Sequence, residues 1–196
     1  RRSSSPAPPS SWSLPLPPEI ENWRSGIGNA VLVNNLAGED VNQAFTEQSG
    51  NCTVMYYSFL VNVTDAASSK AGDYFIHLGN RASPTSFTLF CARVFARIVS
   101  DNVNFGLSNT ATETYGTTNF SKNTTYLLIV KYTINTAGND ETSLWVFSSG
   151  VPASEGAAGT PEITNTTTAG QDIVDAIGIR QGSPPYPQVV LDGIRI

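Results

Sequence analysis

Charged side chains are scarce in this sequence. Asp, Glu, Lys and Arg make up 14% of its 196 residues, and the formal net charge is −5, whereas about a quarter of an average domain is charged. A basic surface for nucleic acid is therefore not expected. No apolar run is long enough to span a bilayer, so we also expect no membrane insertion.

Cysteine and histidine are nearly absent. The chain has two cysteines, Cys52 and Cys91, and one histidine, His77, which by themselves do not make a structural zinc site. For an oxidising compartment we predict a disulfide between Cys52 and Cys91. It would close a loop of roughly forty residues, worth about 3–4 kcal/mol in the entropic model. The alternative is two buried free thiols that act as small apolar residues.

What the sequence has instead is β-strand patterning, most clearly in residues 123–147. Two apolar runs, 126–134 and 144–147, flank Gly138, Asn139 and Asp140. Glycine and asparagine tolerate positive φ, so this is turn chemistry, and the stretch predicts a β-hairpin. Two strands are not stable alone, so the rest of the chain is expected to supply sheets that cover them.

Further short strands are predicted along the chain, and no convincing amphipathic helix appears. Alternation predicts that two sets of side chains face a core: Met55, Tyr57, Phe59, Val61 and Val63 in one strand, and Phe90, Ala92, Val94, Ala96 and Ile98 in another. The expected strands are 30–33, 54–63, 73–78, 86–99, 103–107, 173–179 and 189–196. The short period favours an all-β, two-sheet antiparallel sandwich over an α/β fold.

Residues 1–18 differ in composition from the rest. They hold six of the twelve prolines, together with many serines, which is typical of an extended polyproline-II segment or linker. We therefore divide the chain into this segment and a domain over residues 19–196. We expect Trp12, Leu14 and Leu16 to anchor residues 1–18, either on the domain of the same chain or on a neighbouring copy.

Eight fragments in this order carry a resemblance to a known family. They are GEDVNQAFTEQ (38–48), YYSFLVNVTDA (56–66), GDYFIHLGN (72–80), FCARVFARI (90–98), NTTYLLIVKYTI (123–134), NDETSLWVF (139–147), IGIRQG (177–182) and LDGIRI (191–196). The series resembles the bacterial laminin-G-like, concanavalin-like jelly-roll domain of secreted and cell-surface proteins. The resemblance covers about residues 26–196 and implies two antiparallel sheets packed face to face, but it implies little about chemistry.

The sequence shows no recognisable catalytic motif. Laminarinase-like enzymes of this fold carry paired carboxylates as E-x-D-x-x-E, and no such run is present. His77 is the one histidine that a Ser–His–Asp triad could use. It lies between Ile76 and Leu78 in a predicted strand, and the sequence has no nucleophile elbow, so we interpret His77 as a structural residue. On these grounds we expect that the protein is not an enzyme, with no catalytic residues.

No cofactor is expected, except that the resemblance makes calcium possible. Laminin-G-like and concanavalin-like domains often hold Ca²⁺ at a sandwich edge, on carboxylate, amide and carbonyl oxygens. Asn139, Asp140 and Glu141 form one candidate cluster, and Asp101, Asn102 and Asn104 form another. Asx turns explain both clusters equally well.

A sugar-binding face is predicted from the strand 86–99. Arg93, Phe95 and Arg97 lie on its mixed face, where aromatic and polar groups could contact a glycan, and Tyr56 and Trp145 could contribute. The alternative is that these residues support packing or an interface.

Glycosylation is predicted at the asparagines that begin N-x-Ser/Thr sequons. These are Asn51, Asn62, Asn119, Asn123 and Asn165.

Two functional hypotheses follow. The first is a non-enzymatic extracellular structural protein, a self-assembling subunit of a surface filament, sheath or layer in which residues 1–18 join copies. The second is a carbohydrate-binding or adhesion module of a larger cell-surface protein. The expected partners are other copies of the chain and glycans.

Overall fold

The computed structural model describes residues 30–34, 40–66, 73–110, 112–166, 170–181 and 186–196. The expected division of the chain at residue 18 and the expected anchors Trp12, Leu14 and Leu16 lie outside these ranges.

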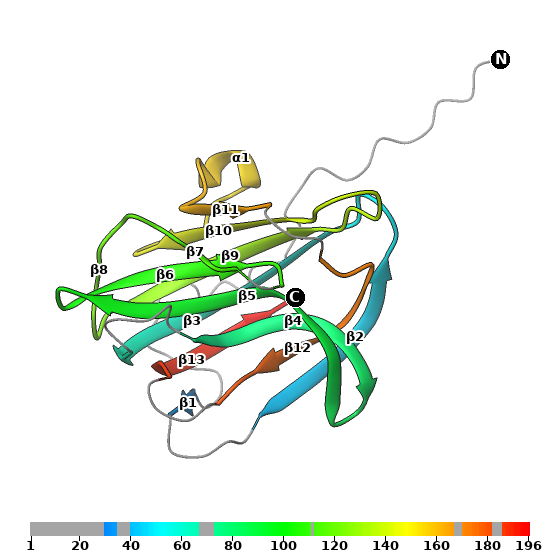
Figure 1. Cartoon of the computed structure of the whole chain (residues 1–196). Helices are drawn as coiled ribbons and strands as arrows, with labels where there is room; N and C mark the ends of the chain where they lie inside the picture. Colours follow the sequence, from blue (N-terminus) through cyan, green and yellow to red (C-terminus); the bar gives the residue numbers. More distant parts are fainter. Residues whose placement is uncertain (1–29, 35–39, 67–72, 111, 167–169, 182–185) are drawn as a thin grey trace.

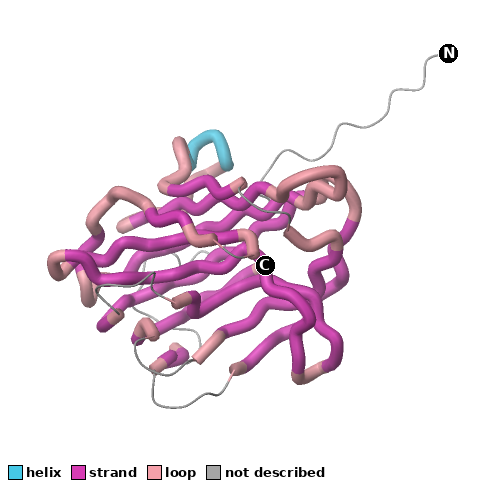
Figure 2. The backbone as a smooth tube through the Cα atoms, in the orientation of Figure 1, coloured by secondary structure: helices cyan, strands magenta, loops and turns pink. Residues whose placement is uncertain are grey.

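Two antiparallel sheets make up almost all of the described structure (Figures 1 and 2). The six-stranded sheet has the order β1 (Val31–Val33), β13 (Gln188–Arg195), β3 (Val54–Asp65), β9 (Thr125–Thr133), β10 (Glu141–Phe147) and β11 (Ile163–Asn165). The seven-stranded sheet has the order β2 (Val41–Ser49), β12 (Ile173–Ile179), β4 (Tyr74–Ser83), β5 (Ser86–Val99), β6 (Asn102–Ser108) and β7 (Thr114–Tyr115), with β8 (Phe120–Ser121) also paired to β6. The predicted jelly-roll sandwich is confirmed.

The expected hairpin lies in the middle of the six-stranded sheet. β9 pairs with β10 on one side and with β3 on the other, and Tyr132 lies opposite Thr142 and Met55. This position explains why β9 has apolar residues on both faces, since its outer face is also partly covered. Leu127 and Ile129, which point away from the core, are 7% and 2% exposed.

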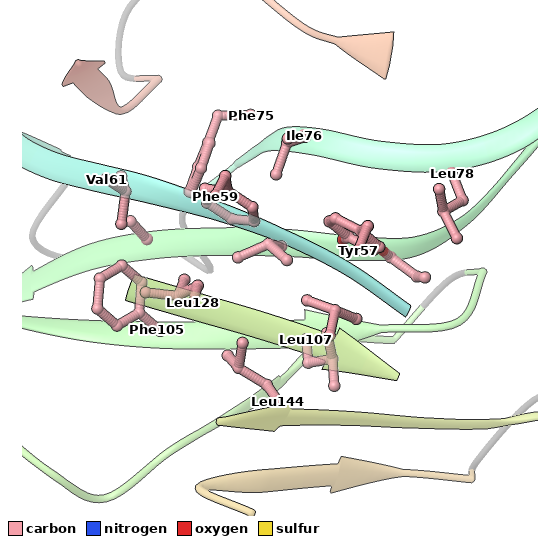
Figure 3. Packing of buried hydrophobic residues seen from close by; sticks show 14 of the residues in the cluster. Tyr57, Phe59, Val61, Phe75, Ile76, Leu78, Phe105, Leu107, Leu128 and Leu144 are labelled. Carbon is pink, nitrogen blue, oxygen red and sulfur yellow. The ribbon is translucent and has the colours of Figure 1, made fainter. Parts of the chain in front are cut away.

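The core lies between the sheets and is built from alternate residues of both (Figure 3). The set Met55, Tyr57, Phe59, Val61 and Val63 of β3 is buried as predicted. The facing layer includes Phe75, Ile76 and Leu78 of β4 and Phe105 and Leu107 of β6. Each fully buried side chain of this size contributes about 1.5–3 kcal/mol to stability.

Strand β5 departs from the predicted alternation at Cys91 and Ala92. Both side chains are fully buried, because the pairing with β4 shifts by one residue here and Ala92 has φ +45°. The hydroxyl of Tyr57 donates to the carbonyl of Ala92 at 2.6 Å and so satisfies a backbone group within the bulge. The prediction therefore holds from Ala92 to Ile98 but is wrong for Phe90, which lies outside the core cluster and is 36% exposed.

A polar network is buried at one end of the sandwich. The Tyr132 hydroxyl donates to the Asp140 carboxylate, which also accepts the backbone N–H groups of Asn135 at 2.7 Å and Gln171 at 2.8 Å. Gly170 is required here, because a Cβ would lie 1.8 Å from Asp140 Oδ2. The network fixes the loops that follow β9 and precede β12.

Helix is limited in the described ranges to α1 (Glu155–Ala158), a single turn beside β10 and β11 (Figure 1). Within those ranges no helix has the length and hydrophobicity needed to cross a bilayer.

Candidate functional site

Arginine and aromatic side chains gather on the outer surface of the seven-stranded sheet. We call this group the arginine face. Its members come from β4, β5, β7 and the residues that follow β12; they are Tyr74, His77, Arg93, Phe95, Arg97, Tyr115, Arg180 and Tyr186. In β5, the inward residues Val94 and Ala96 alternate with Arg93, Phe95 and Arg97, so the period of the strand places the three on one surface.

Arg180 is fixed between two tyrosine rings. Its guanidinium carbon lies 4.4 Å from the centre of the Tyr74 ring and 4.9 Å from that of Tyr186. It forms an ion pair with Asp73 at 2.8 Å and donates to the Tyr186 hydroxyl at 3.0 Å. Arg180 is thus held in one orientation by its neighbours.

Arg93 and Arg97 carry donors that the described residues do not satisfy. Arg93 Nε donates to Ser108 Oγ at 3.1 Å, but its Nη2 has no hydrogen-bond partner among those residues, and neither has Arg97 Nε. Neither arginine has a carboxylate within ion-pair distance in the described part of the chain, although Arg97 stacks on Tyr115 at 3.9 Å. Buried donors without partners cost free energy, so both arginines are held at some cost to stability.

His77 lies beside Arg93 and Arg180 as a neutral imidazole. It is 3% exposed, in contact with the rings of Tyr74, Phe87 and Phe90. Burial lowers its pKa to about 4. Its Nδ1 lies 3.0 Å from the carbonyl oxygen of Leu78, which can only accept, so Nδ1 carries the proton and Nε2 keeps a free electron pair.

Two neighbouring residues determine the surroundings of His77. Gly178 lies directly opposite it in β12, where a Cβ would come within 2.5 Å of Nε2, so glycine is needed for β12 to pack closely against the imidazole. The Tyr74 ring centre is 5.6 Å from that of His77, and burial raises the Tyr74 pKa, so the phenol stays protonated at neutral pH. The arrangement combines a proton acceptor, a proton donor and two cations on one surface.

The structure divides the predicted sugar-binding face between the two sheets. Arg93, Phe95 and Arg97 lie on the seven-stranded sheet, within the arginine face. Tyr56 and Trp145 lie on the outer surface of the six-stranded sheet, near α1, where Tyr56 donates to Glu155 and the Trp145 indole donates to the carbonyl of Gly159. The five residues therefore do not form one surface, although sugar binding by either group remains a prediction.

The predicted disulfide is wrong. Both cysteines are free: Cys52 is exposed in the turn before β3, and Cys91 is fully buried in β5. The bulge in β5 turns Cys91 toward Tyr57 and Tyr132 in the core, away from the surface on which Cys52 lies. For Cys91, the alternative of a buried thiol that packs as an apolar residue applies.

The calcium cluster does not form as predicted. Asp140 is 1% exposed, and both of its oxygens accept hydrogen bonds from Tyr132, Asn135 and Gln171. Glu141 is exposed, and the Asn139 amide donates to the carbonyl of Thr166. The described residues contain no group of three acidic, histidine or cysteine side chains arranged to hold a metal ion.

The sequons differ in accessibility. Asn165 is 1% exposed, and its amide donates to Leu107, Thr112 and Thr114. A glycan on that nitrogen does not fit the folded domain, so the prediction is wrong at Asn165. Asn51, Asn119 and Asn123 are exposed and Asn62 is half-buried; glycosylation at these four remains a prediction.

Sequence reasoning missed five of the eight residues of the arginine face. It treated His77 as structural and did not single out Tyr74, Tyr115, Arg180 or Tyr186. The one available signal was that Arg93, Arg97 and Arg180 are three of only eleven basic residues, all in or beside predicted strands. Their grouping depends on the pairing β12–β4–β5, which alternation alone does not reveal.

Comparisons with known proteins identify the fold. No family model matches the sequence, and no curated protein matches it. Among solved structures, the alginate lyase Aly36B is 13% identical, with a TM-score of 0.50 over 84% of this chain and 78% of that chain. A SAP-like pentraxin from Limulus polyphemus is 10% identical (TM-score 0.49; 82% and 70% covered), and a legume lectin-like domain from Entamoeba histolytica is 9% identical (TM-score 0.42; 85% and 82% covered). The match to Aly36B and the two antiparallel sheets show that the chain has a jelly-roll sandwich fold.

The match to Aly36B contradicts the expectation of a non-enzymatic structural subunit or binding module. That expectation rested on the absence of a hydrolase motif, in which two carboxylates flank the scissile bond. A lyase breaks its bond by proton abstraction and elimination, so the missing carboxylate run excludes only one kind of catalysis. We therefore withdraw the structural-subunit hypothesis and its binding-module alternative.

Proposed function

We propose that the protein is a carbohydrate-active enzyme that cleaves an acidic polysaccharide by β-elimination. The observation that carries the proposal is the arginine face, in which Arg93 and Arg180 lie beside a neutral histidine and a protonated tyrosine. A fold shared with an alginate lyase supports it as an analogy.

Each group has a role that its environment suits. Arg93, which donates to Ser108 through Nε, would bind the uronate carboxylate through its guanidinium and stabilise the charge that develops when the adjacent carbon loses its proton. His77 Nε2 would accept that proton. Tyr74 would donate a proton to the glycosidic oxygen as the bond to it breaks, leaving an unsaturated uronate.

The remaining residues position and extend this centre. Arg180, held by Asp73 and Tyr186, keeps positive charge against the Tyr74 ring. Arg97 lies four residues from Arg93 on the same strand, which is about 13 Å along it, and so could contact a more distant acidic sugar of the same polymer.

The test is incubation with alginate, polyglucuronate and polygalacturonate while following the ultraviolet absorbance of the conjugated unsaturated uronate. We expect product from at least one polymer, and a loss of about 10²-fold or more in rate for His77→Gln and Arg93→Ala. Lys122→Ala is the matched control, because it removes a cation that pairs with exposed Asp101 and is not a member of the arginine face. Absence of product from all three polymers, or an equal loss in the control, would reject the proposal.

Two further proposals concern setting and family. We place the protein outside the cell, as a laminin-G-like member of the jelly-roll class. The supports are the low charge, the polar Ser- and Thr-rich composition and the ordered series of fragments. Association with other copies of itself remains a prediction.

A further inference from the structure

A hollow of about 470 Å³ lies on the opposite side of the molecule from the arginine face. Its floor is the outer surface of β9, β10 and β11, and its wall is the segment that contains α1 (Figure 1). The volume is within the range of small-molecule sites. The hydrophobic core between the sheets separates it from the arginine face, so a ligand here would be distinct from the proposed substrate site.

The wall of the hollow is held in place by hydrogen bonds. Glu155 accepts from Lys131 Nζ and from the Tyr56 hydroxyl, each at 2.7 Å. The Trp145 indole donates to the carbonyl of Gly159 at 2.9 Å. These contacts join both ends of the α1 turn to the sheet, so the hollow is pre-formed and a ligand would not have to order it.

The polar groups that line the hollow suit a ligand rich in hydroxyls. Ser143 and Thr164 have hydroxyl oxygens 3.2 Å apart on neighbouring strands, and each group can donate and accept. The ammonium of Lys131 has two further protons, and each Glu155 oxygen has a second lone pair. A buried Trp145 ring, 4% exposed, supplies a rigid apolar surface beneath them.

The charges of the hollow distinguish its ligand from that of the arginine face. Lys131 and Glu155 neutralise one another at 2.7 Å, and Glu141 adds a negative charge among the lining residues. An acidic polymer would be repelled here. A neutral sugar carries no charge of its own that would have to be desolvated, and its hydroxyls would meet donors and acceptors.

We propose that the hollow over β9, β10 and β11 is a second carbohydrate-binding site, specific for a neutral saccharide. The site goes beyond the proposed lyase activity and does not depend on it. It also gives a role to Tyr56 and Trp145, the two residues of the predicted sugar-binding face that the structure separates from the arginines.

Gly156 offers a way to close the hollow without disturbing the fold. It is one of the lining residues, and an added Cβ would meet only the Ser154 hydroxyl at 4.0 Å. Gly156→Leu therefore places a bulky side chain in open space. Thermal unfolding and circular dichroism of the variant establish that the domain stays folded.

The experiment is a glycan array of neutral oligosaccharides of glucose, mannose, galactose and xylose, with alginate oligosaccharide as the anionic probe. We expect at least one neutral probe to bind wild-type protein, a loss of at least about tenfold in affinity for Gly156→Leu, and unchanged affinity for Arg93→Ala. The proposal is overturned if no neutral probe binds, if folded Gly156→Leu binds as well as wild type, or if Arg93→Ala removes the same binding. Because the readout is binding of uncharged probes, failure here and failure of the lyase assay are separate results.

Discussion

Replacing Tyr132 by phenylalanine tests the buried network at the end of the sandwich. Its side chain is 0% exposed, and its hydroxyl donates to the Asp140 carboxylate and accepts the N–H of Gln171 at 2.7 Å. Phenylalanine preserves the ring and its packing but leaves a buried carboxylate with one donor fewer. Because hydrogen bonds to charged groups contribute about 1.5–3 kcal/mol, we expect the free energy of unfolding to fall by about 2 kcal/mol. Tyr132→Ala, which also removes the ring, should cost about 3–5 kcal/mol.

Urea unfolding followed by tryptophan fluorescence measures both changes. Tyr56→Phe is the matched control, since its hydroxyl also donates to a carboxylate, that of Glu155, but at a half-exposed position where water can replace the lost bond. We expect it to cost less than about 1 kcal/mol. If Tyr132→Phe changed stability by less than about 0.5 kcal/mol, the network would not contribute as we argue.

Two further predictions concern titratable groups. Burial lowers the His77 pKa from 6.5 to about 4, so the unfolded chain binds this proton before the folded protein does as pH falls. The free energy of unfolding of the wild type should therefore fall by about 3 kcal/mol more than that of His77→Gln between about pH 6.5 and 4. Equal decreases for the two proteins in urea titrations at these two pH values would contradict this. Burial raises the Cys91 pKa to about 12, so a maleimide should label Cys52 alone in native protein and both cysteines in urea. Mass spectrometry counts the labels. If neither cysteine were labelled in urea, the two would be joined in a disulfide after all.

Strand alternation predicted most of the fold, because a period of two places side chains on opposite faces wherever pairing is regular. It predicted the inward face of β3 and the central hairpin of β9 and β10. It failed where pairing is irregular. Ala92 has a positive φ, and the residues of β5 that precede it therefore point to the opposite face from the one that alternation predicts. The sequence around Ala92 has no glycine that would indicate this change.

The candidate site was predicted only in part, because it depends on the order of strands across the sheet. Arg93 and Arg97 belong to one strand and could be grouped by period alone. Tyr56 and Trp145 share their polar and aromatic character, and only the topology shows that they lie behind the opposite sheet. Arg180 reaches Tyr74 because β12 pairs with β4 although about a hundred residues separate them.

The bulge in β5 also determines which kinds of sequence change this strand can tolerate. Substitutions at Arg93 or Phe95 alter one outward-facing side chain each, whereas the deletion of a single residue before Arg93 would transfer every later side chain of the strand to the other face. Arginines would then enter the core and Val94 would face water. A variant library of this protein should therefore contain folded substitutions at the outward positions Arg93, Phe95 and Arg97 and almost no folded single-residue deletions in the same strand.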